Sequence, residues 1–489
     1  MIAKRYSLFF ISLFILLNAI KHPVDLDLGW HLRYGQYFFQ TGHVLKDNIL
    51  SNLWPAYQWV QASWGYDLLV YQIFTHFGFF GVALFGGLFT LAIFLLTIFP
   101  FTRFSFFQLL FLCVIFLTQT IPLYFAGMRS QTPSTLFFVL AILIVQGVFL
   151  QIDTFPKKTY LFLPLLFFLW ANMHGGFSLG LMLLTLIWIT NGILLKWTKF
   201  SLKEWFNFGV ILALSYITPL FNPWGFRIYE ETFKHSTNQN LAGIVEWTPL
   251  SYIGQAQFIS AIVVTIAVFA VALARKEVKN IPFLIAFLAT TYLAFSANRF
   301  VILFGVLATY FLANNLFAIK WKLPSPLIPN LAKTALLILI SIDLIFTHFF
   351  FEPFEPATLT FSWKNFCSFG DCSEKVGEAI RKDPPKGIGF HPYNFGGYLT
   401  WNVPEVKTFT DGRMAAWEEN GKTPPVLESD RLALEPVPIT YRTFDSIYHF
   451  NWVITYAKTP LSRYLDDLVK SNKWEKRYEG EGYSYYVKK

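Results

Sequence analysis

Long apolar runs recur along the chain and constrain its fold more than any other feature. They lie at about 7–21, 80–99, 105–122, 131–150, 159–173, 175–195, 205–220, 256–274, 281–296, 299–318 and 333–351. A helix needs roughly 20 apolar residues to cross a bilayer, and it satisfies its own backbone hydrogen bonds there. The sequence therefore predicts a polytopic α-helical membrane protein with about 11 transmembrane helices.

The composition excludes an ordinary soluble enzyme, because 54% of the residues are hydrophobic and only 14% are charged. The formal net charge is +9. In a membrane protein, excess Lys and Arg anchor the cytoplasmic loops, and no basic run or RNA-binding motif accompanies the charge. We therefore expect contact with membrane lipid and no nucleic-acid partner.

The loop charges predict the orientation. Residues 2–20 carry Lys4 and Arg5 before an apolar run, and no cleavage site of small residues follows, so we expect an uncleaved first span. With the N-terminus in the cytoplasm and an odd number of spans, the inside loops hold most of the Lys and Arg. The prediction is a multi-pass protein of the bacterial cytoplasmic (inner) membrane with an extracytoplasmic C-terminal domain.

The predicted domains are a transmembrane domain over 1–351 and a small extracytoplasmic α/β domain over 352–489. The first domain includes the extracytoplasmic loop 22–65, where an apolar pattern predicts amphipathic helices on the membrane surface. Residues 67–77 are predicted to form a helix that lies against the membrane and is not a separate span. In the second domain we expect strands near 387–391, 407–410, 452–456, 474–478 and 483–487 and a helix near 461–471. Cys367 and Cys372 can form a disulfide if this domain is extracytoplasmic.

A cluster of polar residues follows the first span directly. Asp25, Asp27, His31 and Arg33 lie within nine residues of one another, and charges beside a bilayer are costly unless they face a polar cavity. The other outer segments also hold the polar combinations of the chain, with Arg129, His174, Asn222, Glu246 and Arg299 among their residues. The outer face is therefore the predicted working face.

Several motifs resemble known proteins. They are DLDLGWHLRYGQ, LWANMHGGFSLG, NPWGFRIYE and YNFGGYLTWNVPEVKTFTDGR, which begin at residues 25, 169, 222 and 393. With their spacing, they resemble a group of bacterial GT-C-like membrane proteins over nearly the whole chain. The topology is more distantly similar to the protein O-mannosyltransferases, the oligosaccharyltransferases and the aminoarabinose transferases of the GT-C superfamily.

The resemblance implies an inverting glycosyltransferase with a polyprenyl-phosphate sugar as donor and a glycan, lipid or protein of the cell envelope as acceptor. The first-loop carboxylate of the family corresponds to Asp27 as the base, with Asp25 as substitute and His31 beside it. Arg129, Arg299 and His174 are then candidates for binding the donor phosphate. Glu246 and Asn222 are candidates for the acceptor or metal side.

No cofactor is certain from the sequence. A divalent metal, Mg or Mn, would find oxygen ligands in Asp25 or Glu246. The sequence shows no Cys/His metal spacing, Walker loop, Rossmann glycine pattern or nucleophile elbow.

A structural interpretation stands beside each assignment. Asp27 and Asp25 can cap the following helix, and His31 can merely orient Asp27. Arg33 and Arg129 can anchor spans at the interface. Asn222 lies in a sequence typical of a tight turn. Asp411 and Arg413, the last two charged residues of the fourth motif, can bond each other across a turn.

The chain departs from its relatives at Ala62 and Ser63, where related sequences often have a His-Glu pair. This departure motivates an alternative, a non-catalytic scaffold with the same fold. A transporter or flippase for a lipid-linked solute is a third class. Charges deep within the spans would favour it, and the apolar runs hold almost none apart from Asp343.

Overall fold

The computed structural model describes residues 2–20, 25–102, 104–125, 127–149, 156–197, 201–238, 241, 243–252, 255–275, 277, 280–316, 362–369, 371–419, 422–424 and 435–489. Internal contacts divide the chain into two compact units. The bundle unit comprises Met1–His22, Ala83–Thr232 and Val245–Leu359. The α/β unit comprises Pro23–Val82, Phe233–Ile244 and Thr360–Lys489.

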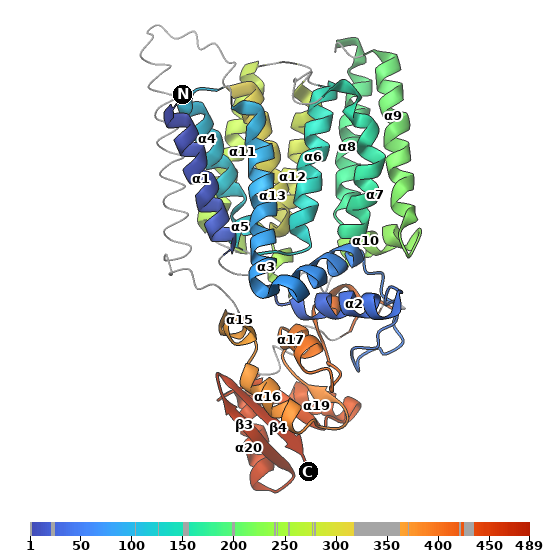
Figure 1. The fold of residues 1–489 in the computed structure, drawn as a ribbon, viewed down its shortest axis with the longest axis vertical. Helices are drawn as coiled ribbons and strands as arrows, with labels where there is room; N and C mark the ends of the chain where they lie inside the picture. The colour runs from blue at the N-terminus through green and yellow to red at the C-terminus, as the bar shows by residue number, and fades with distance from the viewer. Residues whose placement is uncertain are drawn as a thin grey trace. The chain divides into compact units, whose positions relative to one another are not determined.

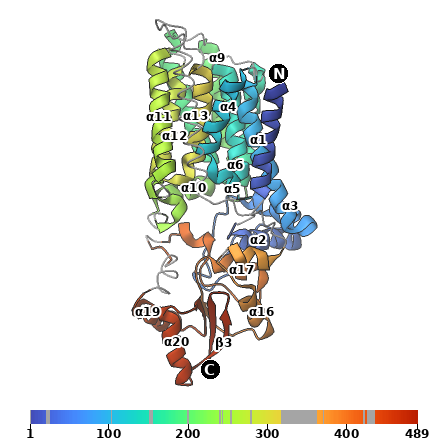
Figure 2. The ribbon, with the colours of Figure 1, turned by 90° about the vertical axis from the view of Figure 1, so that its left-hand side faces the viewer.

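The bundle unit is built from helices. They are α1 (Ile2–Ile20), the second half of α3 (Trp64–Ile98), α4 (Phe106–Gln119), α5 (Ile121–Phe125), α6 (Gln131–Phe149), α7 (Leu163–Met173), α8 (Phe177–Ile193), α9 (Leu202–Ile217), the first half of α10 (Arg227–Thr237), α11 (Gln255–Arg275), α12 (Ile281–Ser296) and α13 (Val301–Asn315). The short 3₁₀ helices include η4 (Thr218–Phe221), η6 (Val245–Trp247) and η9 (Asn298–Phe300). Figures 1 and 2 show α4, α11, α12 and α13 side by side, and α13 packs on the other three.

The predicted apolar segments that lie among the described residues all coincide with helices of this unit. Within those residues, four helices are long and apolar enough to cross a membrane, namely Trp64–Phe101, Gln131–Phe149, Leu202–Phe221 and Gln257–Arg275. The last predicted segment, 333–351, and its Asp343 lie outside the described residues. The total of eleven spans therefore stays a prediction.

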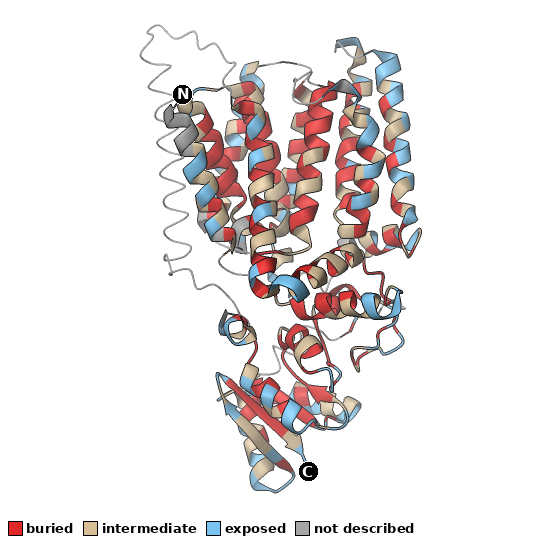
Figure 3. Cartoon of the chain, in the orientation of Figure 1, coloured by how far each residue is buried: buried red, intermediate tan, exposed pale blue. Residues whose placement is uncertain are grey.

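Burial separates central helices from peripheral ones within the bundle unit. In Gln131–Phe149, 83% of the apolar window is buried, whereas the window of Leu202–Phe221 is 22% buried. Figure 3 shows the same contrast between α6 and α9. An apolar helix that is exposed on most of its surface needs an apolar surrounding, since exposed apolar area costs free energy in water.

Local sequence accounts for where several helices begin and break. Ser105 and Gln108 form a capping box at the start of α4, and Ser201 and Glu204 form one at the start of α9. Within α3, Gly78 has φ 60° and ψ −155°, so the helical conformation is interrupted there. This interruption divides the 67–77 helix from the 80–99 segment, and the position of the 67–77 helix against the membrane stays a prediction.

The α/β unit contains a four-stranded sheet with the order β1-β2-β4-β3. The strands are β1 (Gly389–Phe390), β2 (Trp452–Tyr456), β3 (Trp474–Gly480) and β4 (Tyr483–Lys488). The pair β1–β2 is parallel and the other two pairs are antiparallel. The helices of this part are α15 (Trp363–Phe369), α16 (Glu374–Lys382), α17 (Phe395–Asn402), α19 (Ile439–Tyr448) and α20 (Pro460–Lys470).

These elements confirm the predicted small α/β fold, with one correction. The segment 407–410 is not a strand of the sheet. Instead, Thr408 forms a single bridge to Ser51, in which the Thr408 N–H donates to the Leu50 carbonyl at 3.1 Å and the Asn52 N–H donates to the Thr408 carbonyl at 2.8 Å. The segment has β-type residues, but its pairing partner is a loop rather than a strand.

The first loop and the C-terminal residues share one hydrophobic core within the α/β unit. Helix α2 (Leu28–Thr41) supplies Trp30 and Tyr34, and the loop after it supplies Trp59. These rings pack with a set of buried C-terminal side chains, including Phe390, Phe409, Met414, Trp417 and Phe450. Helix α2 is the amphipathic helix predicted for this loop, and its buried side faces protein. The contacts thus group the loop with 360–489, although the predicted domains grouped it with 1–351.

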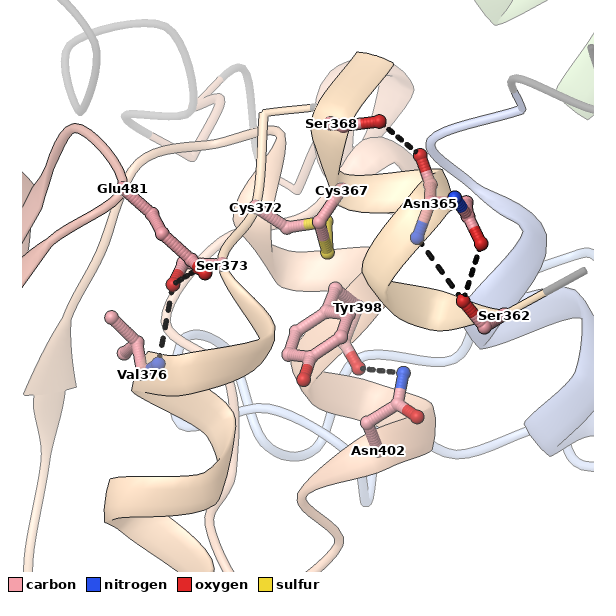
Figure 4. The surroundings of a disulfide bond; sticks show 10 residues. All are labelled: Ser362, Asn365, Cys367, Ser368, Cys372, Ser373, Val376, Tyr398, Asn402 and Glu481. Atoms are coloured by element: carbon pink, nitrogen blue, oxygen red, sulfur yellow. Dashed lines mark hydrogen bonds between the residues drawn. A yellow bond between two sulfur atoms is a disulfide. The ribbon is translucent and has the colours of Figure 1, made fainter. Parts of the chain in front are cut away.

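Cys367 and Cys372 form a disulfide in this unit. It links the end of α15 to the segment before α16. Figure 4 shows Ser373, which follows directly. Its hydroxyl donates to Glu481 at 2.6 Å and accepts from the Val376 N–H at 3.2 Å, so it caps α16. The cap and the disulfide together tie α15 and α16 to the β3–β4 turn.

His391 provides a pH test of the α/β unit. It is fully buried, its Nδ1–H donates to the Pro392 carbonyl at 2.8 Å, and its Nε2 accepts from the Phe409 N–H at 2.9 Å. Burial lowers the pKa of His391 to about 4. Because the unfolded chain has the higher pKa, it binds more protons between about pH 6.5 and pH 4, and stability falls as the pH falls through that window.

We expect a loss of about 3 kcal/mol of unfolding free energy between pH 7 and pH 4 from this group. The measurement is the denaturation midpoint of the full-length protein in detergent across that pH range. His391→Gln is expected to be less stable at pH 7 but to lose much less on acidification. An equally steep pH dependence in that variant would contradict the assignment.

Candidate active site

Asp27 lies directly before α2, at the position that usually caps a helix. Its side chain makes no capping bond to α2 in the described structure. Instead, one carboxylate oxygen, Oδ1, accepts a hydrogen bond from the indole Nε1–H of Trp30 at 2.8 Å. Asp27 is half-buried. The sequence allows Asp27 either as a base or as a helix cap, and this geometry disfavours the cap.

Asp25 shapes the turn that leads into α2. Its side chain is buried, its carbonyl accepts from the Leu28 N–H at 2.9 Å, and its Oδ1 accepts from the Asp27 N–H at 3.2 Å. These bonds hold the backbone of Asp27 in place. They give Asp25 the structural role that the sequence left open, and its role as a second carboxylate stays a prediction.

Two glycines of the C-terminal part, Gly397 and Gly412, pack closely against the turn that contains Asp27. A Cβ atom on Gly412 would lie 1.9 Å from Asp27 Oδ1, so the carboxylate occupies the space that a side chain at this position would need. Nearby, a Cβ atom on Gly397 would lie 2.0 Å from the carbonyl oxygen of Leu26. The turn before α2 thus contacts the backbone of α17 through Leu26 and the backbone of the 3₁₀ helix η11 (Gly412–Ala416) through the Asp27 side chain.

His31 forms a buried histidine–aspartate pair that the sequence did not predict. Its Nδ1 lies 2.5 Å from Oδ1 of Asp67, which is fully buried at the start of α3. The second oxygen of Asp67 accepts from the Gln61 amide at 2.9 Å. The signal for this pair was a carboxylate within an otherwise apolar helical run. The His31 ring also packs against Trp30, with ring centroids 3.6 Å apart and an angle of 31° between the ring planes.

Arg33 has a structural position in the α/β unit. Its guanidinium donates to the carbonyls of Thr400 at 3.1 Å and Trp401 at 3.3 Å, in the last turn of α17. Cations at this position stabilise a helix C-terminus. Burial lowers the pKa of Arg33.

Asp411 and Arg413 bond each other across the turn, as one interpretation predicted. Both side chains are fully buried, and two guanidinium nitrogens lie 2.8 and 2.6 Å from the two carboxylate oxygens. Arg413 also donates to the Tyr34 hydroxyl at 3.3 Å. Burial alone would lower the pKa of Arg413, but the Asp411 carboxylate raises it above its usual value. The pair fixes the shape of the turn that includes Gly412.

In the bundle unit, the structure brings three predicted site residues together. Arg129 precedes α6 and bonds Glu246 in η6. The Arg299 guanidinium in η9 lies 4.1 Å above the Trp247 ring. Burial alone would raise the pKa of Glu246, but the charges of Arg129 and Arg299 hold it below its usual value. We call Arg129, Glu246 and Arg299 the arginine cluster.

The arginine cluster has an excess positive charge, since two guanidinium groups share one carboxylate. The side chains of Arg129 and Glu246 are 27% and 38% exposed, so an anion can reach them. Asn298 donates to the Val245 carbonyl, and its N–H donates to the Thr248 carbonyl at 3.0 Å, which joins η6 to η9. Such a cluster can bind a phosphate through fork-shaped contacts.

His174 lies next to the start of α6. Its Nδ1 accepts from the Gly176 N–H at 2.9 Å and lies 3.1 Å from the Ser134 hydroxyl, at the break between α7 and α8. Asn222 is buried, and its side chain holds the NPWG turn through bonds to the Pro219 carbonyl, the Gly225 carbonyl and the Trp224 N–H. Asn222 thus has the turn role described above, and the ligand roles of both residues stay predictions.

The described residues do not fit a metal site of the predicted kind. Asp25 and Glu246 belong to different units, and each already accepts a hydrogen bond from a protein group. Within the described ranges, no three His, Cys, Asp or Glu side chains gather in a way that could hold a metal ion. We therefore derive no step through a metal.

Solved structures of membrane enzymes share this fold. The oligosaccharyltransferase AglB from Archaeoglobus fulgidus, in complex with an inhibitory peptide and a dolichol-phosphate, has a TM-score of 0.58 and 11% identity, over 93% of this chain and 70% of its own. The oligosaccharyltransferase of that organism in the apo form has a TM-score of 0.57 and 10% identity, over 92% and 70% of the two chains. ArnT from Cupriavidus metallidurans, bound to undecaprenyl phosphate, has a TM-score of 0.50 and 11% identity, over 99% and 97%.

At this level of identity the likeness shows the fold, and the fold is GT-C-like, as the sequence motifs predicted. No protein-family model and no curated protein matches the sequence.

The Asp411–Arg413 pair predicts a stability effect. Asp411→Asn leaves a buried guanidinium without its counter-charge, so we expect a loss of about 3 kcal/mol or more of unfolding free energy. The matched control is Asp467→Asn, which removes the partner of Lys470 from an exposed pair and should change stability little. The measurement is denaturant unfolding of the full-length protein in detergent. Equal effects of the two substitutions would contradict the structural role of the pair.

Proposed function

We propose that this chain is an inverting glycosyltransferase that moves a sugar from a polyprenyl-phosphate donor to a cell-envelope acceptor on the outer face of the bacterial inner membrane. The proposal rests on the GT-C-like fold and, above all, on one observation. Asp27, the family's first-loop carboxylate, lies half-buried at the start of α2 and is held by Trp30 rather than used as a cap. A carboxylate that is held in place but does not serve the helix has the geometry of a general base.

The donor would bind through its phosphate. AglB was solved with a dolichol-phosphate and ArnT with undecaprenyl phosphate, so lipid phosphates bind proteins of this fold. In this chain, Arg129 and Arg299 would neutralise the phosphate, and Glu246 would hold Arg129 in place. His174, beside α6, is a further candidate on the donor side.

The reaction would be a single displacement. Asp27 takes the proton of the acceptor hydroxyl while the hydroxyl oxygen forms a bond to the anomeric carbon. The bond from that carbon to the phosphate oxygen breaks, and the electron pair leaves with the phosphate, whose charge the guanidinium groups stabilise. One displacement inverts the anomeric configuration.

The disulfide supports the outer location. Structural disulfides persist in oxidising compartments such as the periplasm and are rare in the cytosol. The Cys367–Cys372 bond therefore favours an extracytoplasmic α/β unit.

Ala62 and Ser63 keep the scaffold alternative open. In place of a His-Glu pair, Ser63 donates to Gln61 at 3.3 Å, and Gln61 in turn donates to Asp67. Ser63 therefore supports the buried His31–Asp67 pair through Gln61 and is not part of a titrating pair. A protein that lacks transfer activity with every donor would be such a scaffold or a transporter.

Asp27→Asn tests the base. It keeps the shape and the bond to Trp30 but cannot accept a proton, so we expect sugar transfer to fall about 100-fold or more. The measurement is transfer from polyprenyl-phosphate sugars to cell-envelope material by membranes with equal amounts of protein. Asp47→Asn, an exposed change in the same loop, is the control and should keep full activity. Full activity in Asp27→Asn would exclude Asp27 as base.

Arg299→Gln tests the arginine cluster. Because it removes one of two cations, we expect the KM for the lipid donor to rise about tenfold or more. Arg299→Lys should restore only part of the affinity, since an ammonium group lacks the guanidinium fork. The control is Arg275→Gln, which changes an Arg that bonds Glu277 elsewhere in the bundle unit. An unchanged KM in Arg299→Gln would place the donor phosphate elsewhere.

A further inference from the structure

We infer that Trp30 and Gly412 are positioning residues for Asp27. Trp30 acts through a hydrogen bond, and Gly412 acts because its missing side chain leaves room for the Asp27 carboxylate. The inference rests on the proposed function only in naming Asp27 as the base. It makes the turn Asp411–Arg413, far along the chain in the C-terminal part, a component of the same site. All of these residues belong to the α/β unit.

The Trp30 indole has a fixed direction. The side chain is 4% exposed, packs against His31 and meets Tyr34 and Trp59 edge to face at centroid distances of 6.0 and 5.5 Å. His31 is itself held by Asp67. A ring packed on several sides cannot turn its N–H away, so the 2.8 Å bond to Oδ1 sets the orientation of the Asp27 carboxylate.

Gly412, in the C-terminal part of the chain, restricts the position of the Asp27 carboxylate. A Cβ atom there would lie 1.9 Å from Oδ1, 2.6 Å from Cγ and 2.8 Å from Oδ2 of Asp27, distances that real Cβ atoms do not show. The turn cannot yield easily, because Asp411 and Arg413 on either side of Gly412 are paired and fully buried. The backbone of Gly412 thus forms one side of the Asp27 site.

The competing explanation is that both residues only pack the core. Trp59 separates the two explanations, since it is also a buried Trp of this core and touches Trp30, but its indole nitrogen has no hydrogen-bond partner in the described structure. If packing alone matters, Trp30→Phe and Trp59→Phe behave alike. If the hydrogen bond matters, only Trp30→Phe changes the protonation of Asp27.

The first experiment needs no substrate. Dicyclohexylcarbodiimide labels protonated carboxyl groups, and mass spectrometry of the full-length protein in detergent measures the labelling of Asp27 against pH. Trp30→Phe removes a donor that favours the charged carboxylate, so we expect the labelling midpoint to rise by about one pH unit. Trp59→Phe should keep the wild-type midpoint. Asp25, Arg33, the His31–Asp67 pair and the Asp411–Arg413 pair are charged or titratable groups on the described elements around Asp27, and they stay unchanged in both variants.

An unshifted midpoint in Trp30→Phe would overturn the inference for Trp30, whether or not the protein transfers sugar. A shift without any transfer activity in the wild type would leave the positioning intact and count against the proposed function. The two failures are therefore distinguishable.

Gly412→Ala tests the positioning role of Gly412. Its added methyl group must displace the carboxylate, so we expect a changed labelling midpoint and, if the wild type transfers sugar, a fall in kcat of about tenfold or more with little change in the donor KM. The control is Gly480→Ala, whose Cβ would meet only the hydroxyl end of the Tyr478 side chain at 2.7 Å. A Gly412→Ala protein with the wild-type labelling midpoint of Asp27 would overturn the role of Gly412. If Gly412→Ala does not fold, the Trp30→Phe experiment still tests the inference.

Discussion

Direct contact between backbones is the constraint on which the α/β unit depends. A Cβ atom on Gly29 would lie 1.8 Å from the Gly397 carbonyl oxygen, and one on Gly397 would lie 2.0 Å from the Leu26 carbonyl oxygen. No side chain fits between α2 and α17 at these points. The start of α2 is therefore fixed against α17, and Arg33, one turn further on, reaches the last carbonyls of α17. With α2 fixed in this way, the Asp27 carboxylate lies against the backbone of Gly412.

Two groups of charged residues differ in net charge, namely the Asp411–Arg413 pair and the arginine cluster. Asp411 and Arg413 neutralise each other completely in a fully buried place, so they have little capacity for a ligand and serve the fold. The arginine cluster has two guanidinium groups for one carboxylate and is partly exposed. A partly exposed excess of positive charge is what an anion needs. This difference, and not the number of charges, separates a structural pair from a candidate phosphate site.

The sequence predicted the features that depend on local composition. Apolar runs of spanning length became helices because a bilayer demands that length, and the strands at 452–456 and 483–487 followed from β-branched and aromatic residues. Asp27 was recognisable from its place after the first span. The contact with Gly412 and the pairing of His31 with Asp67 were not, because each depends on how distant segments pack. The bond of Asp27 to Trp30 is local, but it depends on side-chain rotamers that the sequence pattern does not specify. The segment 407–410 shows the same limit, since its partner is Ser51 in a loop 357 residues away in the chain.

The hydrogen bond from Trp30 bears on the suitability of Asp27 as a base. A carboxylate paired with an arginine is a weaker base, because the positive charge stabilises the ionised form. Trp30 is a neutral donor, so it orients Asp27 with a smaller loss of basicity than a cation would cause. The two guanidinium groups on adjoining elements have partners of their own, since Arg33 bonds the end of α17 and Arg413 bonds Asp411. The Trp30 bond thus orients the Asp27 carboxylate without adding a positive charge that would weaken it as a base.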